Sequence, residues 1–266
     1  MRYAGWKGDR LIAGFEVPLT MLRKAASSRT IQGDTAGIDA SHLHPEAGKR
    51  SAKKAPASLD DLARTALKAF LIARDAASNV PDLFTHSSRM AFLAIKECEQ
   101  ELDVIERYID ERTPAAITRV NEARARQLLT SLKCTTDLER IGDLVMSMAM
   151  RVQARTGKMA ASDVRQLVEM SKILREMLDL VYHGFLDLDL ERARKVLQMD
   201  KDIDRVCHAL FQKHLTAESD PSSFEVLLMA QALERAGDHT TNLAEDLYSL
   251  IEGRSLRHAP KKRAAT

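Results

Sequence analysis

Aromatic residues, glycine and proline are all scarce in this sequence. Aromatic residues make up 5% of the 266 residues, and the chain contains 11 glycines and 7 prolines. Turn-rich β folds and Pro/Gly-rich disordered chains use more of these residues, so the composition disfavours both classes. Since 45% of the residues are hydrophobic and 29% are charged, the sequence indicates a soluble, helix-rich protein with an aliphatic core.

Cysteine is equally scarce, and long apolar runs are absent. The chain has three cysteines, Cys98, Cys134 and Cys207. Their odd number and wide separation are typical of buried thiols in a reducing compartment. No stretch approaches the roughly 20 apolar residues that span a bilayer, and Glu16 and Pro18 interrupt the early apolar stretch 11–22 before a signal-peptide core develops. We therefore expect a cytoplasmic protein without a membrane-spanning helix.

The formal net charge of +2 conceals an uneven distribution. Residues 1–56 carry 10 Lys/Arg against 5 Asp/Glu, and residues 257–266 add four basic residues, so residues 57–256 carry a charge of −7. The irregular composition of residues 1–56 predicts a disordered basic arm, and residues 257–266 form a basic tail. An acidic body disfavours nucleic-acid binding and favours cations or basic partner surfaces.

Capping signals divide the remaining sequence into six expected helices. The starts are placed at Ser58, Pro81-Asp82, Thr113-Pro114, Ser162-Asp163, Asp187 or Asp189, and Asp220-Pro221. Gly253 lies where the last helix is expected to end. The expected helices span residues 58–78, 82–112, 114–156, 162–187, 189–216 and 221–252.

An internal repeat relates the first three expected helices to the last three. The sequence LERIGD at 138–143 recurs as LERAGD at 233–238, 95 residues later. Glu99 and Asp103 recur as Asp200 and Asp204, 101 residues later. The first repeat therefore has six extra residues, which we place in a loop or helix start near 113–123. These patterns predict an all-α fold of two tandem three-helix bundles, over residues 57–158 and 159–256.

Each repeated motif holds two acidic residues four positions apart, which places both carboxylates on one helix face. Each acid directly follows a position of the expected buried seam, as Glu99 follows Cys98 and Asp103 follows Leu102. If the motif-bearing helices pack together, each bundle gathers four carboxylates at one groove. The eight acids are Glu99, Asp103, Glu139, Asp143, Asp200, Asp204, Glu234 and Asp238.

Like charges gathered in this way require compensation. Oxygen-rich sites suit Mg²⁺, Mn²⁺ or iron, and zinc also binds carboxylates, so we expect metal ions at both clusters. Asp137 and His239 are secondary candidates as ligands. Two alternatives stay open: a single acidic pair is usually a solvated helix face, and Arg140 and Arg235 would neutralise the acids without metal.

Gly142 and Gly237 fall on the expected seam in mid-helix, where glycine costs roughly 1 kcal/mol relative to alanine. Their positions predict a close approach between helices. Five methionines at helical spacings are interpreted as core residues. They are Met146, Met148, Met150, Met170 and Met177.

At these motifs the chain resembles the PhoU family. The resemblance is carried by residues 136–143 and 232–258 and extends over roughly 58–258. It implies two three-helix bundles, with multinuclear iron or zinc clusters held in some members by E/D-x-x-x-D motifs, which correspond here to the eight acids above. The arm 1–56 and Ala236, which stands in place of the usual isoleucine, depart from the family pattern.

The resemblance also implies a non-enzymatic negative regulator of phosphate uptake. Such a protein is an adaptor between the ATPase of the phosphate ABC transporter and a membrane sensor histidine kinase, and is expected here as a homodimer peripheral to membrane complexes. A regulatory role for another phosphate carrier, such as a sodium–phosphate cotransporter, stays open. A di-iron enzyme is disfavoured, because such sites use Glu-x-x-His motifs and no glutamate of this chain has histidine three residues later.

Overall fold

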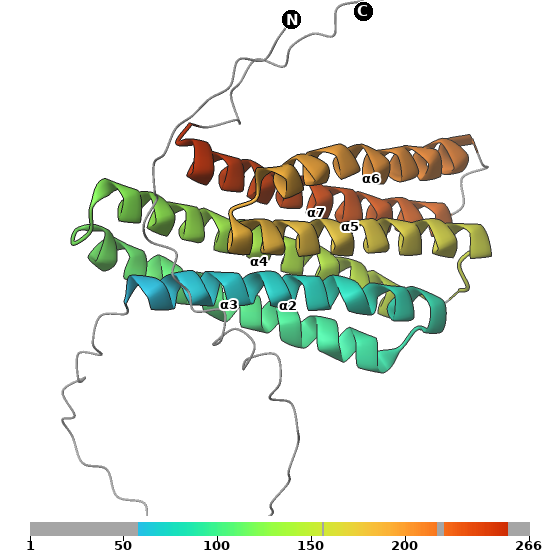
Figure 1. Cartoon of the computed structure of the whole chain (residues 1–266). Coiled ribbons are helices and arrows are strands. Elements are labelled where there is room, and N and C mark those ends of the chain that lie inside the picture. The colour runs from blue at the N-terminus through green and yellow to red at the C-terminus, as the bar shows by residue number, and fades with distance from the viewer. Residues whose placement is uncertain (1–57, 156, 217–220, 255–266) are drawn as a thin grey trace, which may run out of the picture. The chain divides into compact units, whose positions relative to one another are not determined.

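The computed structural model describes residues 58–155, 157–216 and 221–254 (Figure 1). These residues form six α-helices and no β-strand, which confirms the all-α prediction. The helices are α2 (Leu59–His86), α3 (Arg89–Ile117), α4 (Glu122–Ala154), α5 (Ala161–Asp187), α6 (Leu190–Thr216) and α7 (Pro221–Glu252). None of these helices combines the length and apolar content that crossing a bilayer requires. The predicted disordered arm 1–56 and basic tail 257–266 lie outside the described residues.

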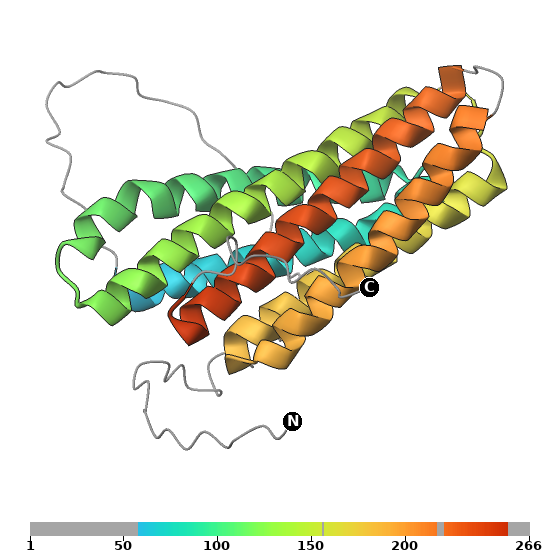
Figure 2. The same cartoon turned by 90° about the horizontal axis from the view of Figure 1, so that it is seen from above.

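The six helices pack in two layers (Figure 2). In one layer α3, α4, α7 and α6 lie side by side in that order, and α2 and α5 pack against one face of it. α2 covers α3 and α4, while α5 covers α6 and α7, so each repeat forms a three-helix bundle. The bundles join along α4 and α7 in one layer and along α2 and α5 in the other. The opposite face of the four-helix layer is left uncovered by other helices of the described chain.

Aliphatic side chains fill the core, and one aromatic pair lies between the repeats. Phe70 of α2 and Phe185 of α5 are buried, with ring centroids 5.2 Å apart. Each fully buried large apolar side chain stabilises the fold by roughly 1.5–3 kcal/mol. The prediction of core methionines is confirmed for the fully buried residues Met148, Met170 and Met177. It is wrong for Met150, whose side chain is exposed, while Met146 is half-buried.

The second helix does not begin at Pro81, as the capping signal predicts. α2 continues past Pro81 and ends at His86. α3 begins after Ser88, whose Oγ accepts a hydrogen bond from the Ala91 backbone N–H at 3.2 Å. Proline removes one helical hydrogen bond. Burial of Val80 and Leu83 on either side of it outweighs that loss.

The third helix also begins later than predicted, because Thr113 and Pro114 lie inside α3. Thr113 is buried, and its hydroxyl donates to the Ile109 carbonyl oxygen at 2.8 Å instead of capping a helix. Asn121 provides the actual cap, since its side chain accepts a hydrogen bond from a backbone N–H in the first turn of α4. Packing of the threonine therefore overrides its local preference for a helix start.

The predicted caps of the second repeat are only partly correct. Ser162 does not cap α5, whose N-cap is Ala160 without a side-chain hydrogen bond. Asp189 accepts a hydrogen bond from a backbone N–H in the first turn of α6 at 2.8 Å, as predicted. Gly253 follows α7 with φ of 72°, a conformation that glycine adopts at helix ends. Asp220 lies outside the described residues.

The insertion in the first repeat lengthens two helices rather than a loop. Counted from the equivalent acids Asp103 and Asp204, α3 continues further than α6 before it ends. Counted back from Glu139 and Glu234, α4 begins a full turn earlier than α7. The additional residues therefore lie at the end of α3 and the start of α4, so the two sets of acids keep equivalent positions in their bundles.

Gly142 and Gly237 lie where the motif-bearing helices approach each other closely. A Cβ atom on Gly142 would lie 2.7 Å from Cδ1 of Leu102 and 3.7 Å from the Cα of Glu99. A Cβ on Gly237 would lie 3.2 Å from Cγ2 of Ile203. The close approach expected from the sequence is confirmed, and it brings the acid-bearing faces of each helix pair together.

Gly142→Ala is expected to lower the free energy of unfolding by about 1–3 kcal/mol, since the buried Leu102 has little room to move from a 2.7 Å contact. Gly237→Ala should change it by less than about 1 kcal/mol, because the contact is looser and alanine favours the helix. Urea denaturation of both variants measures the difference. An equal loss in the two variants would contradict this account of the packing.

Candidate metal centre

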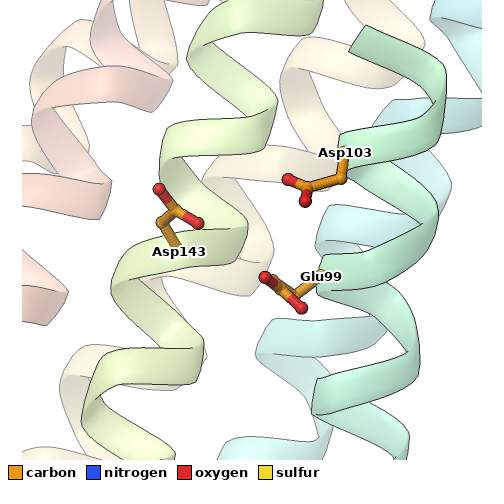
Figure 3. A group of neighbouring side chains, drawn as sticks. All are labelled: Glu99, Asp103 and Asp143. Carbon is orange, nitrogen blue, oxygen red and sulfur yellow. The ribbon is translucent and has the colours of Figure 1, made fainter. Parts of the chain in front are cut away.

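Three acidic side chains meet between α3 and α4 (Figure 3). Glu99 and Asp103 project from α3 toward Asp143, which projects from the facing side of α4. One carboxylate oxygen from each residue lies within 4.8 Å of the corresponding oxygens of the other two. Oxygens bound to one hard cation at 2.0–2.6 Å are at most about 5 Å apart. The donor set and its spacing therefore fit a single cation.

The position of these acids follows from the burial of the residues beside them. Leu102 is buried in the core, and Asp103 directly follows it at the edge of the buried stripe. Gly142 is also buried and directly precedes Asp143 on α4. Because the core draws the two stripes together, the half-buried carboxylates beside them must come together as well. Burial, and then the charges of Asp103 and Asp143, raise the pKa of Glu99.

Glu139 borders this group from one turn earlier on α4. Burial, followed by the charge of Asp143, raises the pKa of Glu139 to about 7, and its side chain is only 17% exposed. Arg140 lies 3.4 Å from carboxylate oxygens of both Glu139 and Asp143 and opposes this shift. The pKa of Glu139 nevertheless stays well above its ordinary value, so Arg140 compensates the negative charge only in part.

Glu106 belongs to the same electrostatic environment and is absent from the residues expected from the sequence. Its carboxylate accepts a hydrogen bond from the Thr136 hydroxyl at 3.4 Å and contributes to the raised pKa of Glu139. The spacing of three residues after Asp103 is a signal that could have identified it. The repeat comparison conceals it, because Cys207 occupies the equivalent position in α6.

The second group of acids is gathered more loosely. Burial raises the pKa of Glu234, and the charges of Asp238, Asp204 and Asp200 raise it further. Burial and then the charge of Asp204 likewise raise the pKa of Asp238. Asp200 accepts a hydrogen bond from the hydroxyl of Thr241 at 3.0 Å. Among the described residues, only the group of the first repeat has three carboxylates within the spacing given above.

Cys207 faces this second group. Its thiol pKa is raised to about 11 by burial, and then by the negative charges of Glu234 and Asp204. The thiol is therefore protonated at neutral pH. In agreement with the sequence prediction, Cys134 and Cys207 are buried, whereas Cys98 is only half-buried.

Asp137 and His239 pair with each other rather than joining either group. Nδ1 of His239 lies 2.8 Å from Oδ1 of Asp137, and the Asn242 side chain donates to the same oxygen at 3.3 Å. Nearby, Nζ of Lys133 lies 3.2 Å from Oδ1 of the buried Asp246. All these contacts join α4 to α7, so Asp137 and His239 connect the two repeats.

A family model described as the PhoU domain matches residues 58–152 and 167–247. This chain belongs to the PhoU family. The two matches fall on α2–α4 and on α5–α7, so the internal repeat corresponds to two copies of the PhoU domain. The family resemblance predicted from the acidic motifs is thereby confirmed.

Several relatives are named phosphate-specific transport system accessory protein PhoU homolog. The Rhizobium meliloti (strain 1021) homolog is 32% identical over 164 residues, which is 57% of this chain and 68% of the relative. The Burkholderia sp. homolog is 28% identical over 194 residues, or 69% of this chain and 83% of the relative. For the Clostridium acetobutylicum homolog, 28% identical over 136 residues, the corresponding shares are 49% and 62%.

Two solved PhoU structures share the fold. The crystal structure of PhoU from Pseudomonas aeruginosa has a TM-score of 0.66 and 22% identity, covering 74% of this chain and 98% of that one. The phosphate transport system regulatory protein PhoU from Streptococcus pneumoniae has a TM-score of 0.67 and 22% identity, covering 74% and 97%. At this identity the likeness establishes the PhoU architecture of the six helices.

The raised pKa of Glu139 predicts a pH-dependent stability of this PhoU protein without metal. Between about pH 5 and 7 the folded protein binds more protons at Glu139 than the unfolded chain does, since the pKa falls from about 7 toward 4.5 on unfolding. The free energy of unfolding should therefore decrease as pH rises, by up to about 1.4 kcal/mol per pH unit from this residue. Urea denaturation in EDTA measures this slope.

Glu139→Gln keeps the side chain neutral and is expected to flatten that slope and stabilise the metal-free protein near neutral pH. Glu97→Gln, at an exposed position of α3, serves as the matched control and should leave the slope unchanged. If Glu139→Gln and the native protein show the same pH dependence, the electrostatic description of the site is wrong.

Proposed function

We propose that this PhoU-family protein is a non-enzymatic negative regulator of phosphate uptake and phosphate-starvation signalling. The PhoU match over both helical repeats is the observation that carries the proposal. The names of the relatives, which describe accessory proteins of phosphate-specific transport, support its assignment to phosphate transport. Since both repeats are matched, the proposal concerns the body of six helices rather than one isolated segment.

In this proposal the protein is an adaptor between the ATPase subunit of the phosphate ABC transporter and a membrane sensor histidine kinase. It acts in the cytoplasm as a homodimer, peripheral to these membrane complexes, and lowers kinase signalling when phosphate is plentiful. The charge of −7 over residues 57–256 supports docking on basic partner surfaces. Negative charge also favours fast, salt-sensitive association with such partners.

The proposal also assigns a cation to Glu99, Asp103 and Asp143, with Glu139 beside them. A bound Mg²⁺, Mn²⁺, iron or zinc ion supplies positive charge between α3 and α4. The three carboxylates provide oxygen ligands from two helices and thereby hold α3 against α4. The looser group of Asp200, Asp204, Glu234 and Asp238 is proposed as a second, weaker site. The raised pKa values of Glu99 and Glu139 support this proposal, because they arise from burial and then from neighbouring carboxylates, and a bound cation would oppose both effects.

Protein purified without chelator is expected to contain bound Fe, Mn, Zn or Mg by elemental analysis. Asp103→Asn combined with Asp143→Asn should lower the metal content, because it removes anionic ligands from both helices of the first group. EDTA should lower the Tm of the native protein and have little effect on this variant. Glu97→Gln is the control and should retain the metal. A metal-free native protein whose Tm is insensitive to EDTA would contradict the cation proposal.

Deletion of the gene is expected to derepress phosphate-starvation genes in medium rich in phosphate, because the kinase would no longer be restrained. Transcript levels of those genes, with and without a complementing copy, measure the effect. Unchanged expression would refute the adaptor role. Altered phosphate uptake without altered expression would instead indicate a regulator of another phosphate carrier, such as a sodium–phosphate cotransporter.

A further inference from the structure

On α4, α6 and α7, three large apolar side chains remain exposed at one end of the four-helix layer. Met150 of α4 is 52% exposed, Leu215 of α6 is 70% exposed and Phe224 of α7 is 62% exposed. Figure 1 shows the end of α4, the end of α6 and the start of α7 at the same end of the helices, on the right. Exposed side chains of this size in one place indicate an interaction surface.

Two contacts between helices place these side chains next to one another. Nη1 of Arg151 lies 3.7 Å from Oε2 of Glu225 between α4 and α7. Nδ1 of His214 lies 2.8 Å from the Ser223 hydroxyl between α6 and α7. Each contact residue is the direct sequence neighbour of one of the apolar residues.

The direction of the helices decides which way these neighbours point. α4 and α6 run antiparallel to α7. When two residues face each other across antiparallel helices, the residues that directly follow them in sequence both lie on one side of the helix pair, and the residues that directly precede them both lie on the other side. Met150 and Phe224 directly precede the two residues of the Arg151–Glu225 contact. Leu215 and Phe224 directly follow the two residues of the His214–Ser223 contact. The three side chains therefore form one apolar patch, Met150, Leu215 and Phe224, across α4, α7 and α6.

The apolar patch continues into the acidic groups along the same helix faces. Met150 lies two helical turns after Asp143, about 10 Å along α4. Leu215 lies three turns after Asp204 along α6 and so returns to nearly the same face. The uncovered face of the layer thus has an apolar end beside acidic sites nearer its middle.

The fold itself does not require this apolar patch. Repeat spacing relates Phe224 to Leu129, Met150 to Glu245 and Leu215 to Pro114. These counterparts include one charged residue and one proline, yet both repeats pack in the same way. Leu129 is the exposed counterpart that carries a large apolar side chain, at 47% exposure. Packing therefore gives no reason for three apolar residues to cluster where α4 of the first repeat meets α6 and α7 of the second.

We propose that the apolar patch and the adjoining carboxylates dock a basic amphipathic helix of a partner protein. Apolar side chains at one end of such a helix would cover Met150, Leu215 and Phe224. Lysine or arginine side chains two to three turns further along would reach the acidic groups. Each group has four carboxylates and therefore carries more negative charge than one divalent cation neutralises, so the surface matches helix-in-groove recognition with charge complementarity. This inference rests on the proposed adaptor role for its biological purpose, and on the described contacts for its geometry.

Charge disfavours the other two occupants of such a surface. An anionic bilayer would attract basic residues, but the face that carries the patch also carries the carboxylates of both groups. A second copy docking through the same face would bring two sets of carboxylates close together, where like charges repel. A basic helix is the occupant for which both halves of the surface are complementary.

The test uses a fluorescein-labelled helical peptide of about 18 residues, roughly 27 Å long. Leucines occupy one face of its first half, and lysines occupy the same face of its second half. A control peptide keeps the leucines and replaces each lysine with glutamate. The full chain should bind the lysine peptide in a fluorescence anisotropy titration, at least about tenfold more tightly than the glutamate peptide. Added NaCl should weaken binding.

Variants of the patch locate the bound peptide. Phe224→Ser and Met150→Ser should each weaken binding by about tenfold, as expected for exposed anchors at the centre of a contact. Leu129→Ser, the repeat counterpart, should leave binding unchanged. Since all three residues are exposed, circular dichroism should show the same helix content in each variant.

Several outcomes would overturn this inference. They are no binding of the lysine peptide at about 100 μM, equal binding of the glutamate peptide, and insensitivity to Phe224→Ser. Sedimentation with anionic vesicles would instead reveal a membrane-binding role if the native protein bound the vesicles and Phe224→Ser did not. Sedimentation without vesicles would reveal self-association through the patch if the native protein associated and this variant did not. A failed peptide titration leaves the phosphate-starvation experiment unaffected, and the reverse also holds, so the two proposals fail separately.

Discussion

Burial of the apolar seams is the constraint on which the acidic sites depend. Glycines at 142 and 237 allow α4 to approach α3 and α7 to approach α6, and the apolar residues beside the acids are drawn into the core. The acids cannot separate without exposing those residues. Hydrophobic burial worth roughly 1.5–3 kcal/mol per large side chain therefore holds these acids together. Partial burial of the carboxylates, and then the charges of their neighbours, raise the pKa values of Glu99 and Glu234.

The two repeats meet this constraint to different degrees. In the first repeat three carboxylates come close enough to share an ion, while Glu106 adds further negative charge. In the second repeat the acids are more widely spaced, and the position equivalent to Glu106 is the thiol of Cys207. The tighter α3–α4 contact at Gly142, compared with that at Gly237, agrees with this difference. Similar sequence motifs thus produce two unequal electrostatic environments.

Contacts between the repeats make the two bundles one packed body of six helices. Lys133 with Asp246, and Asp137 with His239, join α4 to α7. On the other layer, Phe70 packs on Phe185 between α2 and α5. This arrangement leaves one broad face uncovered, and both acidic groups and the apolar patch lie on it. A single face with acidic and apolar regions agrees with the proposed docking role.

The sequence by itself determined the helix count, the repeat, the helix face of each acid and the need for glycine at 142 and 237. These properties are local or periodic, because a helix places residues four apart on one face whatever it packs against. Only the tertiary structure decided that Glu99, Asp103 and Asp143 converge, and that Asp137 of α4 pairs with His239 of α7. It also decided that Pro81 and Thr113 lie within helices and that Met150 is exposed. Helical periodicity specifies which face of its own helix a residue occupies. Which other helix packs against that face depends on how all the apolar surfaces of the chain are buried together.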